Sequence, residues 1–534
     1  MQQRYTRHFS FLLYFFLGKR GPTYKRIGKH TNFLRNKLGS DFDQLQITAM
    51  KKLELVFIPI PGYGHLKSAI ELAKRLVDRD ERLSITVLVI SNPAQTDIDS
   101  YTKSSAASNA RIKYTTIHPT DPLPQGPQPS SSSPISLEKL ATLFIESHKS
   151  QVEQAVRELV SDDSTHLLGF VLDMFCSCMI DVANKFKVPS YIFFTSNTAF
   201  LGFLLHLPIR HNQVGFSFNP SDPDSLIPSY QNHVPVNVLP GAVFDKTGGG
   251  YETFLYLGTK FQECKGFIVN SYVELEPYAV NSMVAQPSVY PVGPLLDHNK
   301  STGSIEIKNW LDKQPSKSVL FLCFGSMGSF KQPQIEQIAI ALERSGHRFL
   351  WSIRQPSPAM HGAPSDYTSY EKVMPDGFFG RVKERGMVCG WAPQIEVLAH
   401  GAVKGFVSHC GWNSILESMW CGVPIATWPL NAEQQLNAFL VVRELGLAVE
   451  LSLTYRSSGT ELVMADQIER AIDCLMDDTN PVRERVEKIS QKSRKALING
   501  GSSFVTLGKL VDDMLQNIGA ERSGFFTDSL NFEY

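Results

Sequence analysis

The segment SHCGWNS at residues 408–414 places a histidine, a glycine and two small polar residues where an apolar run gives way to a helical pattern. The N-terminus of a helix exposes unpaired N–H groups and a partial positive charge, so it binds anions. Gly411 would let a phosphate approach the backbone, and His409 could add a side-chain donor. Asn413 and Ser414 could offer both side chains and backbone amides. This combination suits the binding of a diphosphate.

The same residue types also allow simpler interpretations. Ser414 and Glu417 have the spacing of a capping box, so the segment could do no more than begin a helix. His65, in PGYGHLKS, could be an ordinary loop histidine after a Pro-Gly turn. Asp173, at the end of LLGFVLD, could cap the helix that follows it. The residues alone leave both a functional and a structural interpretation open at each of these positions.

Other polar or aromatic residues also follow directly on strand-like runs. In open α/β sheets, ligands bind beyond the carboxyl ends of the strands, so we expect these residues to share one type of sheet edge. If two such domains faced each other, the two edges would line one cleft between the domains. The residues are His65, Asp173 and Thr195 in the first half, and Ser326, Trp391, Gln394, His409, Glu433 and Gln434 in the second.

The elements that must position these residues alternate between strand and helix from residue 53 onward. Such alternation implies an α/β fold with parallel sheets and right-handed crossovers. Helices are expected after PGYGH, around 137–160 and in QIEQIAIALERSG, whereas residues 208–255 show no clear pattern. Strands are expected at 53–60, 83–90, 110–117, 167–173, 190–195, 266–271 and 318–326, and in HRFLWSIR, GMVCGW, VKGFVSH and PIATWP.

The alternation breaks once, near residue 300, where Pro, Gly, Ser and charged residues occur without periodicity, as in a linker. The break predicts two domains, each a Rossmann-like parallel sheet with helices. Because Met50 directly precedes the first strand, we expect residues 1–49 to be a disordered or mis-assigned leader outside the fold. The predicted parts are a first domain at 50–296, a linker at 297–306, a second domain at 307–518 and a C-terminal tail at 519–534.

Composition excludes several classes of protein. The chain has 534 residues, of which 43% are apolar and 19% charged, which is typical of a globular protein with more than one domain. The formal net charge of +0 gives no basic footprint for nucleic acid. No apolar run reaches the length of a membrane span. The run FLLYFFLG at 11–18 could be the core of a signal or transit peptide, although no clear cleavage site follows it.

The eight cysteines lie mostly in apolar runs such as LFLCFG, and no C-x2-C pair occurs. We therefore expect reduced, buried thiols in a cytoplasmic protein rather than disulfides or a metal site. No D-x-D run stands at a strand end, so no metal is suggested. The loop PGYGHLKS lacks the G-x-G-x-x-G pattern, which argues against a nicotinamide oxidoreductase.

Residues 391–434 resemble the donor-binding signature of plant secondary-product glycosyltransferases, the family-1 UDP-dependent enzymes. The segment begins with WAPQ, contains HCGWNS and ends with EQ, over the same 44 positions. The similarity spans roughly residues 50–518 and includes PGYGHLKSAIELAKRL, VNSYVELE, YPVGPL and LFLCFGSMGSF. It implies a GT-B fold, in which two Rossmann-like domains face a cleft, and a monomer that binds a UDP-sugar and a small-molecule acceptor. The details most resemble the branch that acts on flavonoids, other phenolics or terpenoids.

The resemblance also implies a role for each residue of the signature. Trp391 would stack on uracil, a task for which an aromatic face is suited, and Glu417 would accept hydrogen bonds from the ribose hydroxyls. Ala392, Gln394 and Trp412 would belong to the same donor site, with Gln394 beside the base. The remaining assignments are His409, Asn413, Ser414 and Ser326 to the diphosphate, and Glu433 and Gln434 to the sugar hydroxyls.

Two positions bear on the choice of sugar. In this family a terminal glutamine accompanies glucose donors, whereas histidine often accompanies galactose, so Gln434 favours UDP-glucose. Asn431 stands where close relatives commonly carry an aromatic residue. Its side chain would border the sugar pocket or the mouth of the acceptor site.

By the same resemblance, His65 is the general base and Asp173 its partner. A neutral imidazole with a pKa near 6.5 can take the proton of an attacking hydroxyl, and a carboxylate behind the ring fixes the tautomer and stabilises the imidazolium. Attack opposite the leaving diphosphate would invert the anomeric centre and give a β-glucoside without a metal or cofactor. The alternative is a nucleotide-sugar-binding protein without turnover, which would keep residues 391–434 but lose the base.

Overall fold

A computed structural model describes residues 52–91, 97–106, 109–119, 135–215, 217–283, 287–297, 305–358 and 362–528. The predicted leader at 1–49, most of the predicted linker and the last residues of the predicted tail lie outside these ranges. No described helix is both long enough and apolar enough to cross a membrane.

The first sheet has seven parallel strands in the order β3-β2-β1-β4-β5-β6-β7. The sequences of the central strands are nearly continuous apolar runs, because helices cover both faces of the sheet, as expected for a parallel sheet. The strands are β1 (Lys52–Ile58), β2 (Leu83–Ile90), β3 (Ile112–Ile117), β4 (Thr165–Asp173), β5 (Ser190–Phe194), β6 (Gly266–Val269) and β7 (Ser288–Pro291).

The second sheet has six parallel strands in the order β10-β9-β8-β11-β12-β13, so the predicted α/β class with two parallel sheets is confirmed. The strand order reverses between β1 and β4 in the first sheet and between β8 and β11 in the second. Open parallel sheets bind ligands at such switch points. The strands are β8 (Val319–Cys323), β9 (Arg348–Ser352), β10 (Gly386–Cys389), β11 (Val403–Ser408), β12 (Ile425–Thr427) and β13 (Ala448–Glu450).

Helices of the first half differ from the sequence prediction in two places. The helix expected around 137–160 is two helices, and the segment without clear pattern contains the end of one long helix and the start of another. The helices are α4 (Tyr63–Arg79), α5 (Asp97–Ala106), α6 (Leu137–Glu146), α7 (Lys149–Val160), α8 (Ile180–Lys185), α9 (Thr198–Val214), α10 (Gly250–Lys260) and α11 (Pro277–Ser282). Short 3-10 turns are η1 (Met174–Met179), η2 (Val236–Val238), η3 (Gly241–Phe244) and η4 (Phe261–Glu263).

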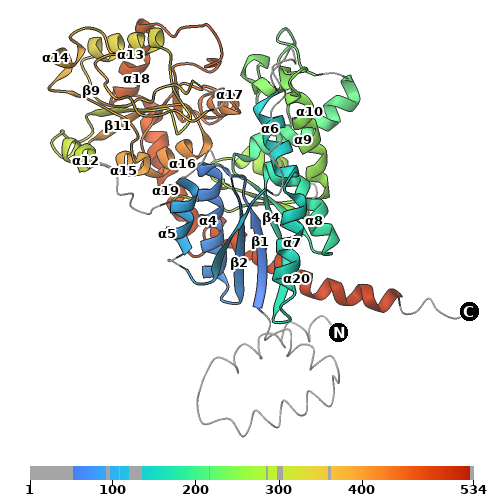
Figure 1. Cartoon of the computed structure of the whole chain (residues 1–534). Coiled ribbons are helices and arrows are strands. Elements are labelled where there is room, and N and C mark those ends of the chain that lie inside the picture. Colours follow the sequence, from blue (N-terminus) through green and yellow to red (C-terminus); the bar gives the residue numbers. More distant parts are fainter. Residues whose placement is uncertain are drawn as a thin grey trace, which may run out of the picture.

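The second half of the chain contains the remaining helices and one π-helical turn, η5 (Leu440–Glu444). They are α12 (Ile305–Leu311), α13 (Gln332–Arg344), α14 (Phe378–Val382), α15 (Gln394–Leu398), α16 (Trp412–Cys421), α17 (Gln434–Phe439), α18 (Ala465–Met476), α19 (Pro481–Leu497) and α20 (Ser502–Asp528). Figure 1 shows the two sheets in separate bodies, with α16 and α17 on the side of the second body that faces the first.

The last helix, α20, returns to the first sheet, where it contacts α4, β4 and β7 (Figure 1). Leu510 and Met514 are fully buried there, and the hydroxyl of Tyr191 donates to Asp513 Oδ2 over 2.6 Å. We therefore call β1 to β7 with α20 the first unit and α12 to α19 the second unit. The sequence prediction did not include this return, and its boundary at residue 518 falls inside α20.

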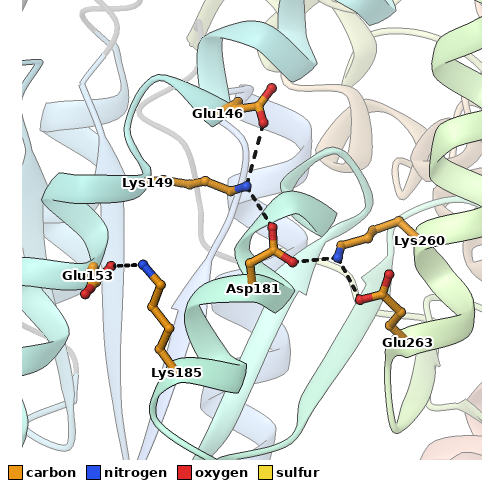
Figure 2. A network of polar contacts seen from close by, with 7 residues as sticks. All are labelled: Glu146, Lys149, Glu153, Asp181, Lys185, Lys260 and Glu263. Atoms are coloured by element: carbon orange, nitrogen blue, oxygen red, sulfur yellow. Dashed lines mark hydrogen bonds and ion pairs between the residues drawn. The ribbon is translucent and has the colours of Figure 1, made fainter.

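Ion pairs hold the outer helices of the first unit together, as Figure 2 shows. Asp181 at the start of α8 pairs with Lys149 of α7 at 2.8 Å and with Lys260 of α10 at 2.6 Å. Burial alone would raise the pKa of Asp181, but the two ammonium groups hold it below its usual value. This bridge therefore joins α7, α8 and α10.

Candidate active site

His65 and Asp173 form a hydrogen-bonded pair at the carboxyl edge of the first sheet. The Nδ1 atom of His65 lies 2.7 Å from Oδ2 of Asp173. The pair forms because β1 and β4 are neighbours, so the start of α4 after β1 meets the last residue of β4. His65 lies in the first turn of α4, so the interpretation of a loop histidine is wrong.

Asp173 makes both of the contacts that the sequence left as alternatives. Its Oδ1 accepts a hydrogen bond from the backbone N–H of Phe175 over 3.1 Å and so caps η1, while Oδ2 faces His65. Thr195, which follows β5, brings its Oγ1 to 3.0 Å from the same Nδ1 atom of His65. Since Nδ1 is engaged by these groups, Nε2 is left without a partner among the described residues and is the nitrogen that a substrate can reach.

The carboxylates around this pair raise the pKa of the imidazole. Burial lowers the pKa of His65, but the carboxylates of Asp173 and Glu433 outweigh it and raise the pKa above its ordinary value of 6.5. The Asp173 side chain is almost fully buried, with 1% exposed, whereas 34% of the His65 side chain remains exposed. A buried carboxylate behind a partly exposed ring is an arrangement that can receive a proton from a bound hydroxyl.

The start of α16 differs from a capping box. The N-cap residue is Gly411, and no side chain caps the first-turn amides of the helix. Ser414 is therefore inside the helix, where its Oγ accepts from Gln394 Nε2 over 2.8 Å. Glu417 Oε2 accepts from the same amide over 2.7 Å. The capping-box interpretation is wrong, because the helix begins three residues earlier than it requires.

The imidazole of His409 is enclosed by two glycines. A Cβ atom on Gly325 would come within 2.6 Å of His409 Nε2, and one on Gly411 within 2.4 Å, so neither position has room for a side chain. Gly325 also has a φ of 73°, which favours glycine. Burial lowers the pKa of His409 to about 4, so the ring is neutral at pH 7 and would act as an N–H donor, not as a cation.

Residues expected at the base and ribose lie around α15 and α16. The Trp391 side chain is 45% exposed, so its face is open to a planar ligand, whereas Ala392 beside it is buried. Burial raises the pKa of Glu417 to about 7, although the Gln394 amide and the charge of Lys67 act in the opposite direction. Ser326, in the loop after β8, is exposed and its hydroxyl has no partner among the described residues.

Glu433 and Gln434 begin α17 and differ in their partners. Glu433 Oε1 accepts from Ser196 Oγ of the first unit over 3.2 Å. Gln434 turns toward its own loop, where Oε1 accepts from the backbone N–H of Leu430 over 2.8 Å. Its Nε2 donates to Asn431 Oδ1 over 3.2 Å, so the residue at which this chain departs from the family pattern contacts the expected sugar-binding glutamine directly.

The starts of α4 and α16 meet, which brings the two sheet edges together. Asn413 Nδ2 donates to the carbonyl oxygen of Gly64 over 3.4 Å, and Asn413 Oδ1 accepts from Asn270 Nδ2 over 3.3 Å. Trp412 is buried, and its Nε1 donates to the carbonyl oxygen of Asn270 over 2.7 Å. Its indole therefore joins the two units, a contact that the expected donor-site role did not include.

Sequence reasoning did not identify several residues of this interface. Ser68 on α4 donates to Asn413 Oδ1 over 3.4 Å, and Asn197 and Asn437 form a buried pair between the units. Asn270 had one available signal, because it directly follows the strand β6 in the segment VNS. Ser68, Asn197 and Asn437 lie within or at the start of helices, so their sequence positions give no such signal.

Comparison with known proteins shows what the chain is similar to. A family model described as UDP-glucoronosyl and UDP-glucosyl transferase matches residues 259–490. The chain is 47% identical to UDP-glycosyltransferase 71K1 of Malus domestica, over 87% of this chain and 99% of that protein. It is 46% identical to UDP-glucose flavonoid 3-O-glucosyltransferase 6 of Fragaria ananassa, over 87% of this chain and 99% of that protein.

A solved structure resembles the whole described fold. The crystal structure of Medicago truncatula UGT71G1 complexed with UDP-glucose has a TM-score of 0.78 and 43% sequence identity, and it covers 87% of this chain and 98% of that chain. The expectation of two Rossmann-like domains in a GT-B arrangement is therefore confirmed.

Proposed function

The chain belongs to the plant UDP-glycosyltransferase family and is an enzyme of that class, and we propose that it transfers glucose from UDP-glucose to a hydroxyl of a small lipophilic metabolite. The acceptor class is a flavonoid, another phenolic or a terpenoid, and the product is a β-glucoside. One observation carries the proposal: the His65–Asp173 pair lies beside Gly64, whose carbonyl contacts Asn413 at the start of α16. The proposed base and the proposed anion-binding helix terminus thus lie next to each other.

In the transfer step, the acceptor oxygen forms a bond to the anomeric carbon as His65 Nε2 takes the hydroxyl proton. Asp173 holds Nδ1–H and stabilises the imidazolium that results. The bond between the anomeric carbon and the phosphate oxygen breaks, and its electron pair leaves with UDP. Because attack and departure occur on opposite faces of the sugar, an α-linked donor gives a β-linked product.

The departing diphosphate gains negative charge, which the second unit can stabilise. The uncapped first-turn amides of α16 and the neutral ring of His409 are donors fixed in place before the reaction. Each well-placed donor of this kind typically contributes on the order of 3 kcal/mol to transition-state stabilisation. With Asn413, Ser414 and Ser326 as further diphosphate contacts, we propose that the reaction needs no metal ion and no cofactor.

The remaining donor contacts follow the signature. Trp391 would stack on uracil with Gln394 beside it, while Glu417 would bind the ribose hydroxyls. Glu433 and Gln434 would bind the sugar hydroxyls. Glucose as the sugar is supported by Gln434 and by the UDP-glucose named for the Medicago and Fragaria proteins.

The acceptor would occupy the first unit beside His65. The Phe175 ring lies with its centroid 6.4 Å from that of His65, which offers an apolar wall next to the base. Residues 200–214 belong to α9, and Phe200 is buried in the core. A flavonoid or related phenolic is supported by the name of the Fragaria relative.

A panel of phenolic and terpenoid acceptors with radiolabelled UDP-glucose tests the proposal. Transfer of label by the wild-type protein, and its loss in His65→Ala, is the expected result. Tight binding of UDP-glucose without transfer to any acceptor would instead support a binding protein without turnover. If the wild-type protein neither bound UDP-glucose nor transferred glucose, both functions would be refuted.

A further inference from the structure

Two asparagines from different units meet in the protein interior. Asn197, the N-cap of α9, donates from Nδ2 to Oδ1 of Asn437 in α17 over 2.6 Å. Both side chains are 0% exposed. Burying two amides costs free energy unless their donors and acceptors are paired, so such a pair is retained only where its bonds are made.

The other bonds of the pair fix both amides in one orientation. Asn197 Oδ1 accepts from the backbone N–H of Phe200 over 2.7 Å, so its Nδ2 must point across the interface. Asn437 Nδ2 donates to the carbonyl oxygen of Cys410 over 3.0 Å and to Glu433 Oε1 over 3.3 Å. A carbonyl and a carboxylate only accept, so a flipped Asn437 amide would lose both bonds.

The two acceptors of Asn437 belong to the two parts of the donor site. Glu433 carries the carboxylate expected at the sugar, and Cys410 lies between His409 and Gly411 with a φ of 62°, a left-handed conformation that is strained for a residue with a side chain. Glu433 Oε1 is also held by Ser196 of the first unit, while Oε2 has no partner among the described residues. One oxygen is thus fixed and the other is left for a sugar hydroxyl.

We infer that Asn197 and Asn437 are positioning residues that orient Glu433 toward the sugar of the donor once the two units are in contact. The pair acts through Glu433 and the turn at Cys410 and does not itself touch the reacting atoms. The inference rests on the proposed function, because it takes Glu433 as a sugar ligand. It predicts that loss of these hydrogen bonds weakens the binding of UDP-glucose more than the binding of UDP, which lacks the sugar.

Asn437→Ala removes the amide N–H groups that donate hydrogen bonds to Glu433 and to the carbonyl oxygen of Cys410. Asn437→Asp keeps the size of the side chain and the oxygen that Asn197 contacts, but it replaces the N–H donor with a second acceptor oxygen. In the full chain, we expect kcat/KM for UDP-glucose to fall by about 10- to 100-fold in either variant, the range for a lost hydrogen bond to a charged group. The affinity for UDP measured by calorimetry should fall by less than the affinity for UDP-glucose.

Two matched controls separate positioning from loss of stability. Gln435 lies in the same helix, is also 0% exposed and donates to the carbonyl oxygen of Tyr455 over 2.7 Å, without contact to Glu433. Glu444 joins the same two units by accepting from the backbone N–H groups of Gln231 and Asn232, each over 2.8 Å. Gln435→Ala and Glu444→Ala should lower the Tm but leave the preference for UDP-glucose over UDP within about threefold of wild type.

If the Asn437 variants lose no more of that preference than the two controls, the inference is wrong and the pair is only structural. The binding measurement needs no turnover, so it tests the inference even if the wild-type protein transferred glucose to no acceptor. Absence of transfer by the wild type would count against the proposed function alone. Should Asn437→Ala fail to fold, Asn197→Asp provides the second variant, because its carboxylate still caps Phe200 but cannot donate to Asn437.

Discussion

The imidazole of His65 and the carboxylate of Asp173 lie 2.7 Å apart, although 108 residues separate them in the chain. Adjacent parallel strands bring the two together, and no other basic group contacts the Oδ2 atom of Asp173 among the described residues. The carboxylate therefore has the ring as its principal partner, which is what a base and its orienting acid require.

His65→Ala should reduce transfer to an alcohol or phenol acceptor by about 10²- to 10⁴-fold, because the proton of the attacking hydroxyl loses its acceptor. UDP binding should stay near wild type, since the contacts proposed for UDP come from the second unit. Initial rates with a phenolic acceptor and calorimetry with UDP measure the two quantities. Near-normal turnover in this variant would rule out His65 as the base.

Asp173→Asn should shift the pH dependence of turnover as well as its size. Burial lowers the pKa of His65, and the carboxylates of Asp173 and Glu433 outweigh this effect and raise it. The neutral ring is the active base, so the wild-type rate should rise as pH climbs through the raised pKa and level off above it. With Asp173 neutralised, this rise should move to lower pH while the plateau falls by about tenfold or more.

A kcat profile between pH 5 and pH 9 for wild type and Asp173→Asn checks both parts of this prediction. Lys149→Ala serves as a control, since it removes a charge from the outer network of Figure 2 without contacting His65. If the rise occurred at the same pH in all three proteins, Asp173 would not control the titration of His65.

Strand reasoning could place His65 and Asp173 at the same type of sheet edge, because each follows a recognisable strand and parallel strands end at one edge, but their pairing was expected only from the family resemblance. The same reasoning misjudged the start of α16, since Ser414 and Glu417 match a capping box while the left-handed turn at Cys410 begins the helix earlier. Next to that turn, His409 packs against Gly325 from a distant loop, a contact that local spacing does not encode.

Contacts between the two units were also beyond a strand-by-strand prediction. Asn197 and Asn437 are 240 residues apart, and neither follows a strand directly, so only the packing of α9 against α17 brings them together. The same holds for α20, whose amphipathic sequence shows that it needs an apolar partner but not which sheet provides it.

Gln434→His should lower the use of UDP-glucose relative to UDP-galactose. The Gln434 side chain is held by the backbone of Leu430 and by Asn431, and the two nitrogens of an imidazole ring would not occupy the positions of its amide oxygen and nitrogen. The ratio of kcat/KM values for the two donors, with one acceptor, measures the change, which should be about tenfold. An unaltered ratio would show that position 434 does not read the sugar.

Gly411→Ala should weaken UDP binding by about tenfold, the loss of one charge-assisted hydrogen bond, because its Cβ would lie 2.4 Å from His409 Nε2 and displace the ring. The φ of Gly411 is −61°, so this substitution tests the collision without adding backbone strain. Gly401→Ala is the matched control, since a Cβ there meets nothing within 4 Å. Calorimetry with UDP compares the two variants.

The collision can be separated from any direct need for glycine at the phosphate by combining Gly411→Ala with His409→Ala. If displacement of the ring is the cause, the double variant should bind UDP as weakly as His409→Ala alone, because the added methyl group then has no ring to displace. If the two substitutions instead lowered the affinity for UDP independently and additively, the phosphate itself would need the open backbone at Gly411. The position of His409 would then not be the reason why residue 411 is a glycine.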